Sequence, residues 1–143
     1  MRVASVKCVN DSVGGNYTVR TLADVPDILG DYPGEMQMFT SELETEQVAI
    51  TYRRMPQHTG GKGSYGHFHR EQEEVYFVIS GRLQFKLGDD VIEAGKGTAI
   101  RIAPDVVRSV WNEAPEDAEL LIVSKRIGDP SGDVATVPDF WPE

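Results

Sequence analysis

From residue 36 onward the chain is a succession of short hydrophobic runs separated by turn residues. Residues 83–87 alternate between large apolar and polar side chains, the period-two pattern of a strand with one buried face. Residues 75–79 and 120–123 are apolar or aromatic throughout, which predicts strands covered on both faces. The pattern predicts strands over residues 37–43, 47–55, 74–80, 83–87, 90–93, 98–102, 106–112 and 119–126. Short strands with tight turns and no long helix predict an all-β sandwich, jelly roll or barrel.

Both ends of the chain differ from this central region. Residues 1–35 are interrupted by glycine and proline, and we predict an arm with a short strand at residues 17–20 and one helical turn from Thr21. Residues 127–143 are loop-like but end in Phe140 and Trp141, which predicts a tail that packs on its own barrel or on a second subunit. The expected organisation is an N-terminal arm over 1–35, a barrel over 36–126 and a C-terminal tail over 127–143.

The composition narrows the classes of partner and compartment. A chain of 143 residues can enclose one hydrophobic core, and its formal net charge of −9 disfavours nucleic acid and anionic lipid as partners. The longest unbroken apolar run, residues 75–79, is far shorter than the about 20 residues that span a bilayer, so we expect no membrane segment. The single cysteine, Cys8, excludes an intramolecular disulfide, and the first residues lack the apolar region of a signal peptide. We therefore expect a cytoplasmic protein in which Cys8 is structural.

The residues that suggest chemistry are concentrated between residues 61 and 81. His67 and His69 stand two positions apart on an extended segment, so both side chains project from one face. Glu74, on the next strand, can close on the two imidazoles. Imidazole and carboxylate together suit divalent iron, manganese, nickel, copper or zinc, and a set of three ligands leaves coordination positions open for a substrate. The spacing therefore predicts a metal site made of His67, His69 and Glu74.

The same segment resembles the first sequence motif of the cupin superfamily, which reads glycine, five residues, HxH, three or four residues, glutamate, six residues, glycine. The fixed positions of that motif are matched by Gly61, His67, His69, Glu74 and Gly81. The six residues required before the closing glycine place Glu74, rather than Glu73, in the ligand position. The run from His67 to Gly81 is also similar to that of small single-domain cupins with an HRHREQEEVY-like sequence. The resemblance implies a single-domain cupin β-barrel, of the jelly-roll or double-stranded β-helix type, with a short N-terminal arm and a C-terminal tail.

The second cupin motif is present in a changed form, because Arg108 stands where the family has its fourth metal ligand, a histidine. A permanent cation at this position repels a nearby divalent ion, so both the occupancy and the identity of the metal stay open. Arg108 has two alternative roles. It holds the carboxylate or phosphate of a small anionic ligand through two parallel hydrogen bonds, or it pairs with Glu74 as a buried structural ion pair.

Two further residues are candidates for contact with a substrate. Tyr76 shares the strand parity of Glu74 and is expected to face the cavity, where it orients a ligand or packs as part of the wall. His58 lies in the glycine-rich loop before His67, where it gates the cavity or is simply solvated. With Arg108, these residues complete the predicted site.

These observations leave three hypotheses for function open. The first is a metal-dependent small-molecule enzyme with oxygenase, isomerase or decarboxylase-type chemistry, of the kind that the family resemblance implies. The second is a metal-free sensor or carrier that recognises an anionic metabolite through Arg108, with His67 and His69 beside it. The third is an interaction module with a vestigial pocket. The same polar residues serve an enzyme and a binder, so the sequence identifies neither the substrate nor whether catalysis occurs.

The resemblance also predicts a homodimer, since cupins commonly pair through an outer sheet or exchanged arms. Size-exclusion chromatography with light scattering, at micromolar concentration, is then expected to give twice the chain mass of 15.8 kDa. A monomeric mass over a tenfold dilution series would contradict the prediction.

Overall fold

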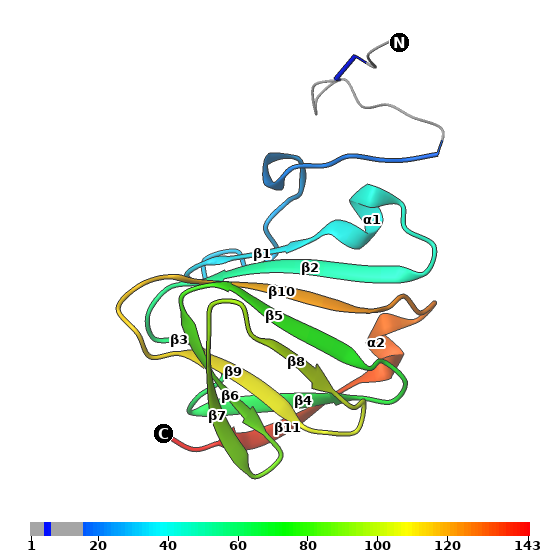
Figure 1. The fold of residues 1–143 in the computed structure, drawn as a ribbon. Helices are drawn as coiled ribbons and strands as arrows, with labels where there is room; N and C mark the ends of the chain where they lie inside the picture. Colours follow the sequence, from blue (N-terminus) through cyan, green and yellow to red (C-terminus); the bar gives the residue numbers. More distant parts are fainter. Residues whose placement is uncertain (1–4, 7–15) are drawn as a thin grey trace.

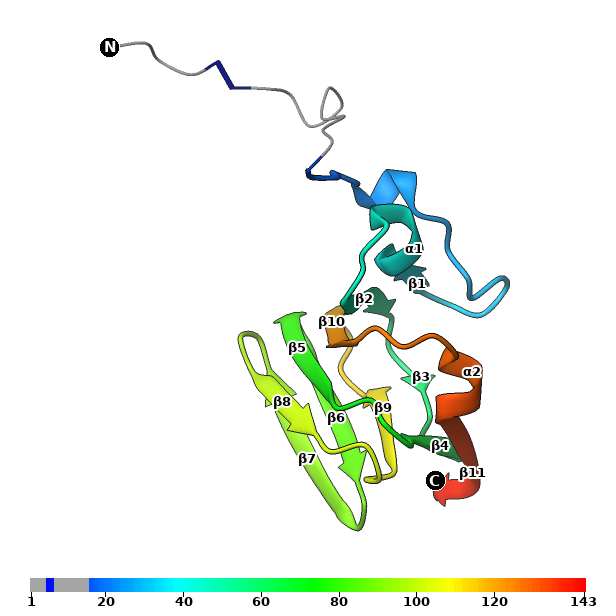
Figure 2. The same cartoon turned by 90° about the vertical axis from the view of Figure 1, so that its right-hand side faces the viewer.

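The computed structural model describes residues 5–6 and 16–143, and these form two antiparallel sheets that face each other (Figure 1; Figure 2). In order across the sheet, the first contains β1 (Glu35–Met38), β2 (Val48–Met55), β10 (Ala118–Lys125), β5 (Glu74–Ser80) and β8 (Ala99–Ile102). The second contains β11 (Val134–Trp141), β4 (Ser64–His69), β9 (Arg108–Asn112), β6 (Arg82–Leu87) and β7 (Asp90–Gly95), and the short β3 (Thr59–Gly60) pairs with β9. The helical elements are a 3-10 turn (Leu22–Asp24), α1 (Phe39–Leu43) and α2 (Pro130–Asp133). The predicted all-β fold is confirmed.

The core lies between the two sheets and follows the period-two alternation of the strands. On β5, Glu74, Tyr76 and Val78 point inward and are buried, whereas Val75 and Phe77 point outward. The buried apolar residues that fill the space between the sheets are Met55, Tyr76, Val78, Leu83, Phe85, Ala94, Ile102, Val110, Ala118 and Leu120. Since both sheets contribute to this set, neither sheet buries its apolar face without the other.

The outer face of β5 differs from the sequence prediction. Val75 and Phe77 retain 37% and 39% of their exposure, so this strand is not covered on both faces by the part of the chain that the structure describes. The apolar run at residues 75–79 therefore predicts the strand correctly but not its outer environment.

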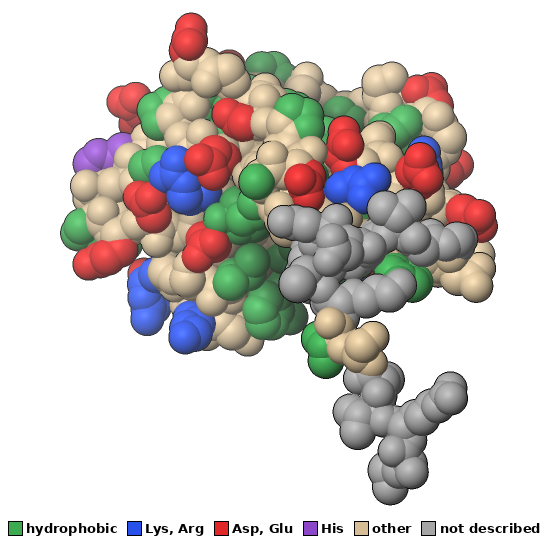
Figure 3. All heavy atoms as spheres, turned by 90° about the horizontal axis from the view of Figure 1, so that it is seen from above, with side chains coloured by type: hydrophobic (Ala, Val, Ile, Leu, Met, Phe, Trp, Pro, Cys, Tyr) green, Lys and Arg blue, Asp and Glu red, His purple; other side chains and the backbone are tan. Residues whose placement is uncertain are grey.

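The view in Figure 3, from above, shows acidic and basic side chains interspersed, with no large area of basic side chains alone. The described residues include no helix long and apolar enough to cross a membrane.

The strand predicted over residues 37–43 is wrong beyond Met38. The chain leaves the sheet there and forms α1, which ends at Glu44 in the left-handed region with φ of 57°. Phe39 and Leu43 are four positions apart, a helical spacing that the strand prediction overlooked. The hydroxyl of Thr40 also accepts a hydrogen bond from the backbone N–H of Ile50, at 3.0 Å, and so fixes α1 against β2.

The tail is not loop-like throughout, because residues 134–141 form β11. This strand pairs antiparallel with β4 of the same chain, with Val134 opposite His69 and Thr136 opposite His67. Trp141 is buried, so the tail packs on its own barrel, one of the two alternatives that its aromatic residues suggested. The proline within β11 argued against a strand in the sequence. It is tolerated here because β11 lies at the edge of its sheet.

The N-terminal arm contains the predicted helical turn but not the predicted strand. The backbone N–H of Thr21 donates to the Asp24 carboxylate at 2.8 Å and begins the 3-10 turn. Residues 17–20 belong to neither sheet. Asp27 makes a single antiparallel bridge to Gln37, which brings the arm to the edge strand β1. Cys8 lies outside the described residues.

Gly81, the last residue of the first motif, and Asn112, at the end of β9, help to close the barrel. Gly81 links β5 to β6 with φ of 77°, and a Cβ there would lie 2.7 Å from the carbonyl oxygen of Asp117, so glycine is required. Asn112 is fully buried. Its amide donates to the carbonyls of Met55 and Glu116, both at 2.8 Å. Asn112 therefore ties the end of β9 to β2 and to the loop before β10.

We expect Asn112→Ala to lower the free energy of unfolding by about 2–3 kcal/mol, because it leaves the buried carbonyl of Met55 without its donor. The matched control is Gln57→Ala, which removes an amide that donates to a carbonyl of the same loop from an exposed position. Its expected cost is below about 0.5 kcal/mol. Urea unfolding followed by circular dichroism measures both. Equal costs would show that Asn112 does not have this structural role.

Candidate metal site

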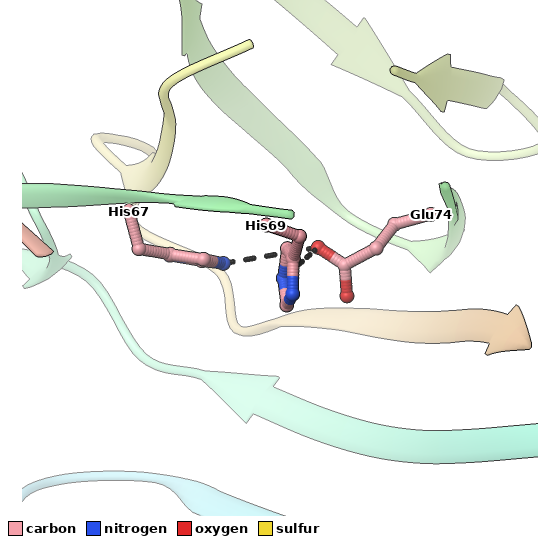
Figure 4. Close-up of side chains that lie close together, drawn as sticks. All are labelled: His67, His69 and Glu74. Carbon is pink, nitrogen blue, oxygen red and sulfur yellow. Dashed lines mark ion pairs between the residues drawn. The ribbon is translucent and has the colours of Figure 1, made fainter. Parts of the chain in front are cut away.

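His67 and His69 project from the inner face of β4, as their spacing predicts, and Glu74 meets them from the start of β5 (Figure 4). Oε1 of Glu74 lies 3.1 Å from Nε2 of His69 and 3.7 Å from Nε2 of His67. The three candidate ligand atoms lie within 4.8 Å of one another. Two atoms bound to one ion at about 2.1 Å, at angles of 90–110°, lie about 3.0–3.4 Å apart. The spacing of the three side chains is therefore close to that of a metal-binding set.

Asp133 sets the orientation and tautomer of His69. Its Oδ2 lies 2.9 Å from Nδ1 of His69, and both side chains are buried. A carboxylate at this distance accepts the Nδ1–H hydrogen bond, which leaves the lone pair of Nε2 free to face Glu74. The contact between Nε2 and Glu74 is short but lacks the direction of a hydrogen bond, so Nε2 is a buried atom without such a partner among the described residues. A buried nitrogen lone pair beside a carboxylate needs a proton or a metal ion between them.

Sequence reasoning missed Asp133, which comes from α2 and lies 64 positions after its partner. The Asp133 carboxylate also accepts a hydrogen bond from the backbone N–H of Glu71 at 2.6 Å. The backbone carbonyl of Asp133 accepts one from the backbone N–H of Arg70 at 2.8 Å. It thereby fixes the loop that carries the chain from β4 to β5. The only local signal was Asp129 followed by Pro130, an N-cap and first-turn pair that marks a helix start. No local pattern connects that helix to His69.

The charges around Glu74 determine the protonation of the site. Burial opposes ionisation of Glu74, but the two imidazoles and the Arg108 guanidinium outweigh it and lower the pKa of the carboxyl to about 2. Burial likewise disfavours the charged form of His69, but the carboxylates of Glu74 and Asp133 outweigh it and raise the pKa of the imidazole. Protons therefore compete with a metal ion for Nε2 of His69, and metal affinity falls as the pH falls.

Tyr76 faces inward, as predicted, but its hydroxyl group reaches Glu74. The Tyr76 O–H donates to Oε1 of Glu74 at 3.1 Å, and its ring packs 5.9 Å from that of Phe85. Burial is the main cause that raises the pKa of Tyr76, so the phenol stays protonated and acts as a donor. In this structure Tyr76 therefore orients the candidate ligand Glu74, and the expectation that it contacts substrate stays a prediction.

Arg108 lies next to Glu74, as both of its alternative roles require. It is fully buried, its position pairs with His67 across β4 and β9, and its Nε lies 3.5 Å from Oε1 of Glu74. Its Nη1 and Nη2 donate to the carbonyls of Pro104 and Ala103, at 3.1 and 3.2 Å. These contacts use one N–H of each terminal nitrogen, whereas Nε makes no hydrogen bond among the described residues. The ion-pair contact with Glu74 is present in the structure, and contact between Arg108 and a ligand stays a prediction.

His58 does not join the cluster. Its ring stacks on Trp111, with centroids 6.1 Å apart and planes inclined by 19°. Trp111 pairs with Gln84 on β6, and Gln84 alternates with the buried Leu83 and Phe85, so this stack lies on the outer face of the second sheet. The expectation that His58 gates the pocket or binds substrate finds no support in this placement. The sequence could not reveal it, because the position of the loop depends on β3 pairing with β9.

A cavity of about 230 Å³ reaches Glu74 from the open end of the first sheet. Its walls come from β1, β2, β10, α1 and the segment before α2. The hydroxyl-bearing residues in these walls are Thr40, Ser41, Thr51 and Ser124, and Arg126 lies among the lining residues. The walls are not polar throughout, because Met38, Ala49 and Ile122 supply apolar surface beside these groups. The cavity suits a small polar molecule that approaches Glu74.

Two antiparallel sheets around an inward-facing set of two histidines and a glutamate define a β-barrel protein with a metal-type site. A family model described as "Cupin domain" matches residues 54–124, and the chain belongs to the cupin superfamily. The predicted cupin fold, with its jelly-roll barrel, is thus confirmed. No curated protein sequence matches the chain.

Solved structures show the same fold at low sequence identity. A cupin protein from Bacteroides fragilis has 21% identity and a TM-score of 0.64, covering 83% of this chain and 92% of that one. A sugar phosphate isomerase from a cupin superfamily, from Silicibacter pomeroyi, has 17% identity and a TM-score of 0.64, covering 86% and 94%. A Cupin 2 conserved barrel domain protein from Salinispora arenicola has 14% identity and a TM-score of 0.59, covering 74% and 86%. Likeness at this level concerns the fold alone.

We predict that Asp133→Asn weakens zinc binding by about 10–100-fold, because the His69 imidazole loses the carboxylate that fixes its tautomer. The matched control is Asp129→Asn on the same helix, which removes a carboxylate that caps α2 and makes no contact with His69. Competition with a chromophoric chelator measures both affinities. Zinc binding of unchanged strength in a folded Asp133→Asn protein would contradict the assigned role.

Proposed function

We propose that this cupin is a metal-dependent enzyme that acts on a small, anionic molecule, with His67, His69 and Glu74 as the metal ligands. The observation that supports it most directly is Nε2 of His69, which lies buried 3.1 Å from the Glu74 carboxylate and has no hydrogen-bond partner among the described residues. Two electron-rich atoms at that distance repel each other unless a cation lies beside both. The residues present therefore fit a divalent ion.

When bound, such an ion supplies Lewis-acid or redox chemistry at coordination positions that the protein leaves open. The chain's own residues determine where those positions lie. Asp133 holds His69, Tyr76 holds Glu74, and Arg108 fills the place of a fourth protein ligand without being able to coordinate an ion. The set thus keeps one more position free for substrate than a site with four protein ligands.

The cavity beside Glu74 supports a polar substrate. Hydroxyl-bearing residues on α1, β2 and β10 offer hydrogen bonds to oxygen-rich molecules, and the Arg126 guanidinium near the opening favours a negative charge. The similar barrel from Silicibacter pomeroyi, named a sugar phosphate isomerase, is compatible with this class of substrate. Of the reactions expected for the family, isomerisation of an anionic polyhydroxylated molecule is the one that these features favour.

One observation favours a second candidate, a metal-free sensor or carrier. The Arg108 guanidinium lies 3.5 Å from Oε1 of Glu74 and already supplies a positive charge to the carboxylate. In that case the barrel binds its anionic ligand without an ion, and the two imidazoles serve as hydrogen-bonding groups. Metal content separates the two candidates.

Untagged protein is expected to contain about one divalent ion per chain by elemental mass spectrometry, and Glu74→Gln is expected to reduce this content at least tenfold. The matched control is Glu73→Gln, since Glu73 is the preceding residue but points outward and pairs with Arg101 at 3.2 Å. Glu73→Gln should keep its metal. If the native protein contains no metal and takes up none from Mn²⁺, Fe²⁺, Ni²⁺, Cu²⁺ or Zn²⁺, the enzyme proposal fails.

Arg108→His provides the complementary measurement. The substitution removes the competing cation and places an imidazole beside His67, so it is expected to increase metal affinity by at least tenfold if the variant folds. Metal uptake by Arg108→His together with none by the native chain would favour the metal-free candidate.

A further inference from the structure

Arg53 is an inward-facing arginine that has no acidic partner in the part of the chain that the structure describes. It lies on β2 between Thr51 and Met55, which are both buried, and its position pairs with that of Leu120, which is fully buried. Alternation along the strand therefore directs its side chain between the sheets. Its Nε is buried and makes no hydrogen bond within the described residues, and its guanidinium makes no ion pair there.

The neighbouring Arg54 shows what a structural arginine of this strand does. It points outward and pairs with Glu35 at 3.3 Å and with Asp117 at 2.7 Å. Both carboxylates satisfy its charge at the surface. Among the described residues, therefore, only the outward-facing arginine has carboxylates beside it, and burying an unpaired cation is costly.

Arg53 has no ion pair with a carboxylate among the described residues, and the groups with an electrostatic effect on it are phenols. Burial lowers the pKa of its guanidinium, and the groups that act on it from nearby are Tyr32, Tyr65 and Tyr76. Tyr32 is fixed to the backbone of Gly60, whose N–H donates to the phenol oxygen at 2.9 Å. Phenols are neutral at physiological pH and both donate and accept hydrogen bonds, so they can complete an anion site without competing for the cation.

The inner face of β4 becomes exposed toward the start of that strand. Tyr65, His67 and His69 alternate on β4 and therefore point to the same side of the sheet. Along this row exposure rises from 5% at His69 to 58% at Tyr65. The row of side chains that contains both candidate histidine ligands therefore runs from the buried interior to an exposed end at Tyr65.

We propose that Arg53 binds the carboxylate or phosphate group of the substrate, while the His67–His69–Glu74 set receives an oxygen at the other end of the same molecule. This inference rests on the proposed function, because it identifies the part of the substrate that lies away from the metal ligands. It also assigns the anion to Arg53 in place of Arg108, which already lies in ion-pair contact with Glu74 and donates to the carbonyls of Pro104 and Ala103.

The strand register sets the length of the substrate. Arg53 aligns through Leu120 with Val78, and Glu74 precedes Val78 by four residues on β5. At about 3.3 Å per residue, the two positions are about 13 Å apart along the strands at the backbone. Long side chains that lean inward from both ends shorten this span. Between them lies Tyr76, whose hydroxyl already contacts Glu74, so the ligand passes over a polar wall.

The test uses the full chain and two simple anions, inorganic phosphate and acetate. Each is titrated at constant ionic strength into metal-free and Zn²⁺-loaded protein, and binding is followed through the Nε–H signal of Arg53 in a 1H–15N spectrum, assigned with Arg53→Lys. Phosphate, acetate or both should shift this signal saturably in the native protein. The stronger of the two identifies the anionic group of the substrate.

Arg53→Met should weaken binding of that anion at least tenfold, Arg53→Lys should retain part of it, and the matched control Arg54→Met should bind like the native protein. Absence of binding to the native protein, or equal binding by Arg53→Met, overturns the proposal. If Arg53→Met does not fold, the Nε–H shift of the native protein decides alone. Anion binding through Arg53 in a chain that takes up no metal would uphold this inference while the proposed enzyme function fails.

Discussion

The site depends on one constraint: the buried carboxylate of Glu74 must be neutralised where water cannot solvate it. A lone carboxylate transferred from water to the interior costs several kcal/mol. Here two imidazoles, the Tyr76 phenol and the Arg108 guanidinium surround a single oxygen atom, Oε1. Each comes from β4, β5 or β9, so the charge on one side chain requires that these strands stay in register.

The C-terminal segment completes the site as well as the sheet. β11 pairs with β4 along the stretch that contains both histidines, and α2, directly before it, supplies the carboxylate for His69. The same Asp133 also binds the loop between β4 and β5. Because one residue fixes an imidazole and the loop that leads to Glu74, the distance between these two candidate ligands depends on the end of the chain. The tail is thus a structural part of the candidate metal site.

Three arginines on the inner and outer faces illustrate how environment assigns a role. Arg108 donates to two backbone carbonyls and lies in ion-pair contact with Glu74, which makes it part of the scaffold around that carboxylate. Arg54 is paired at the surface. Arg53 has the same chemistry and lacks protein partners within the described residues, which leaves its charge for a ligand. Residue type alone does not separate these cases, because guanidinium groups are chemically identical and only their neighbours differ.

The sequence by itself determined the all-β class, most strand positions and the meeting of His67, His69 and Glu74. These follow from period-two alternation and from spacing within a short segment, which are local properties of the chain. It did not determine α1, β11, the outward stack of His58 on Trp111 or the contact of Asp133 with His69. Those depend on which distant strands pair and on what each side chain meets after pairing. Only the tertiary structure decides that, because a contact across 64 positions leaves no periodic trace in the sequence.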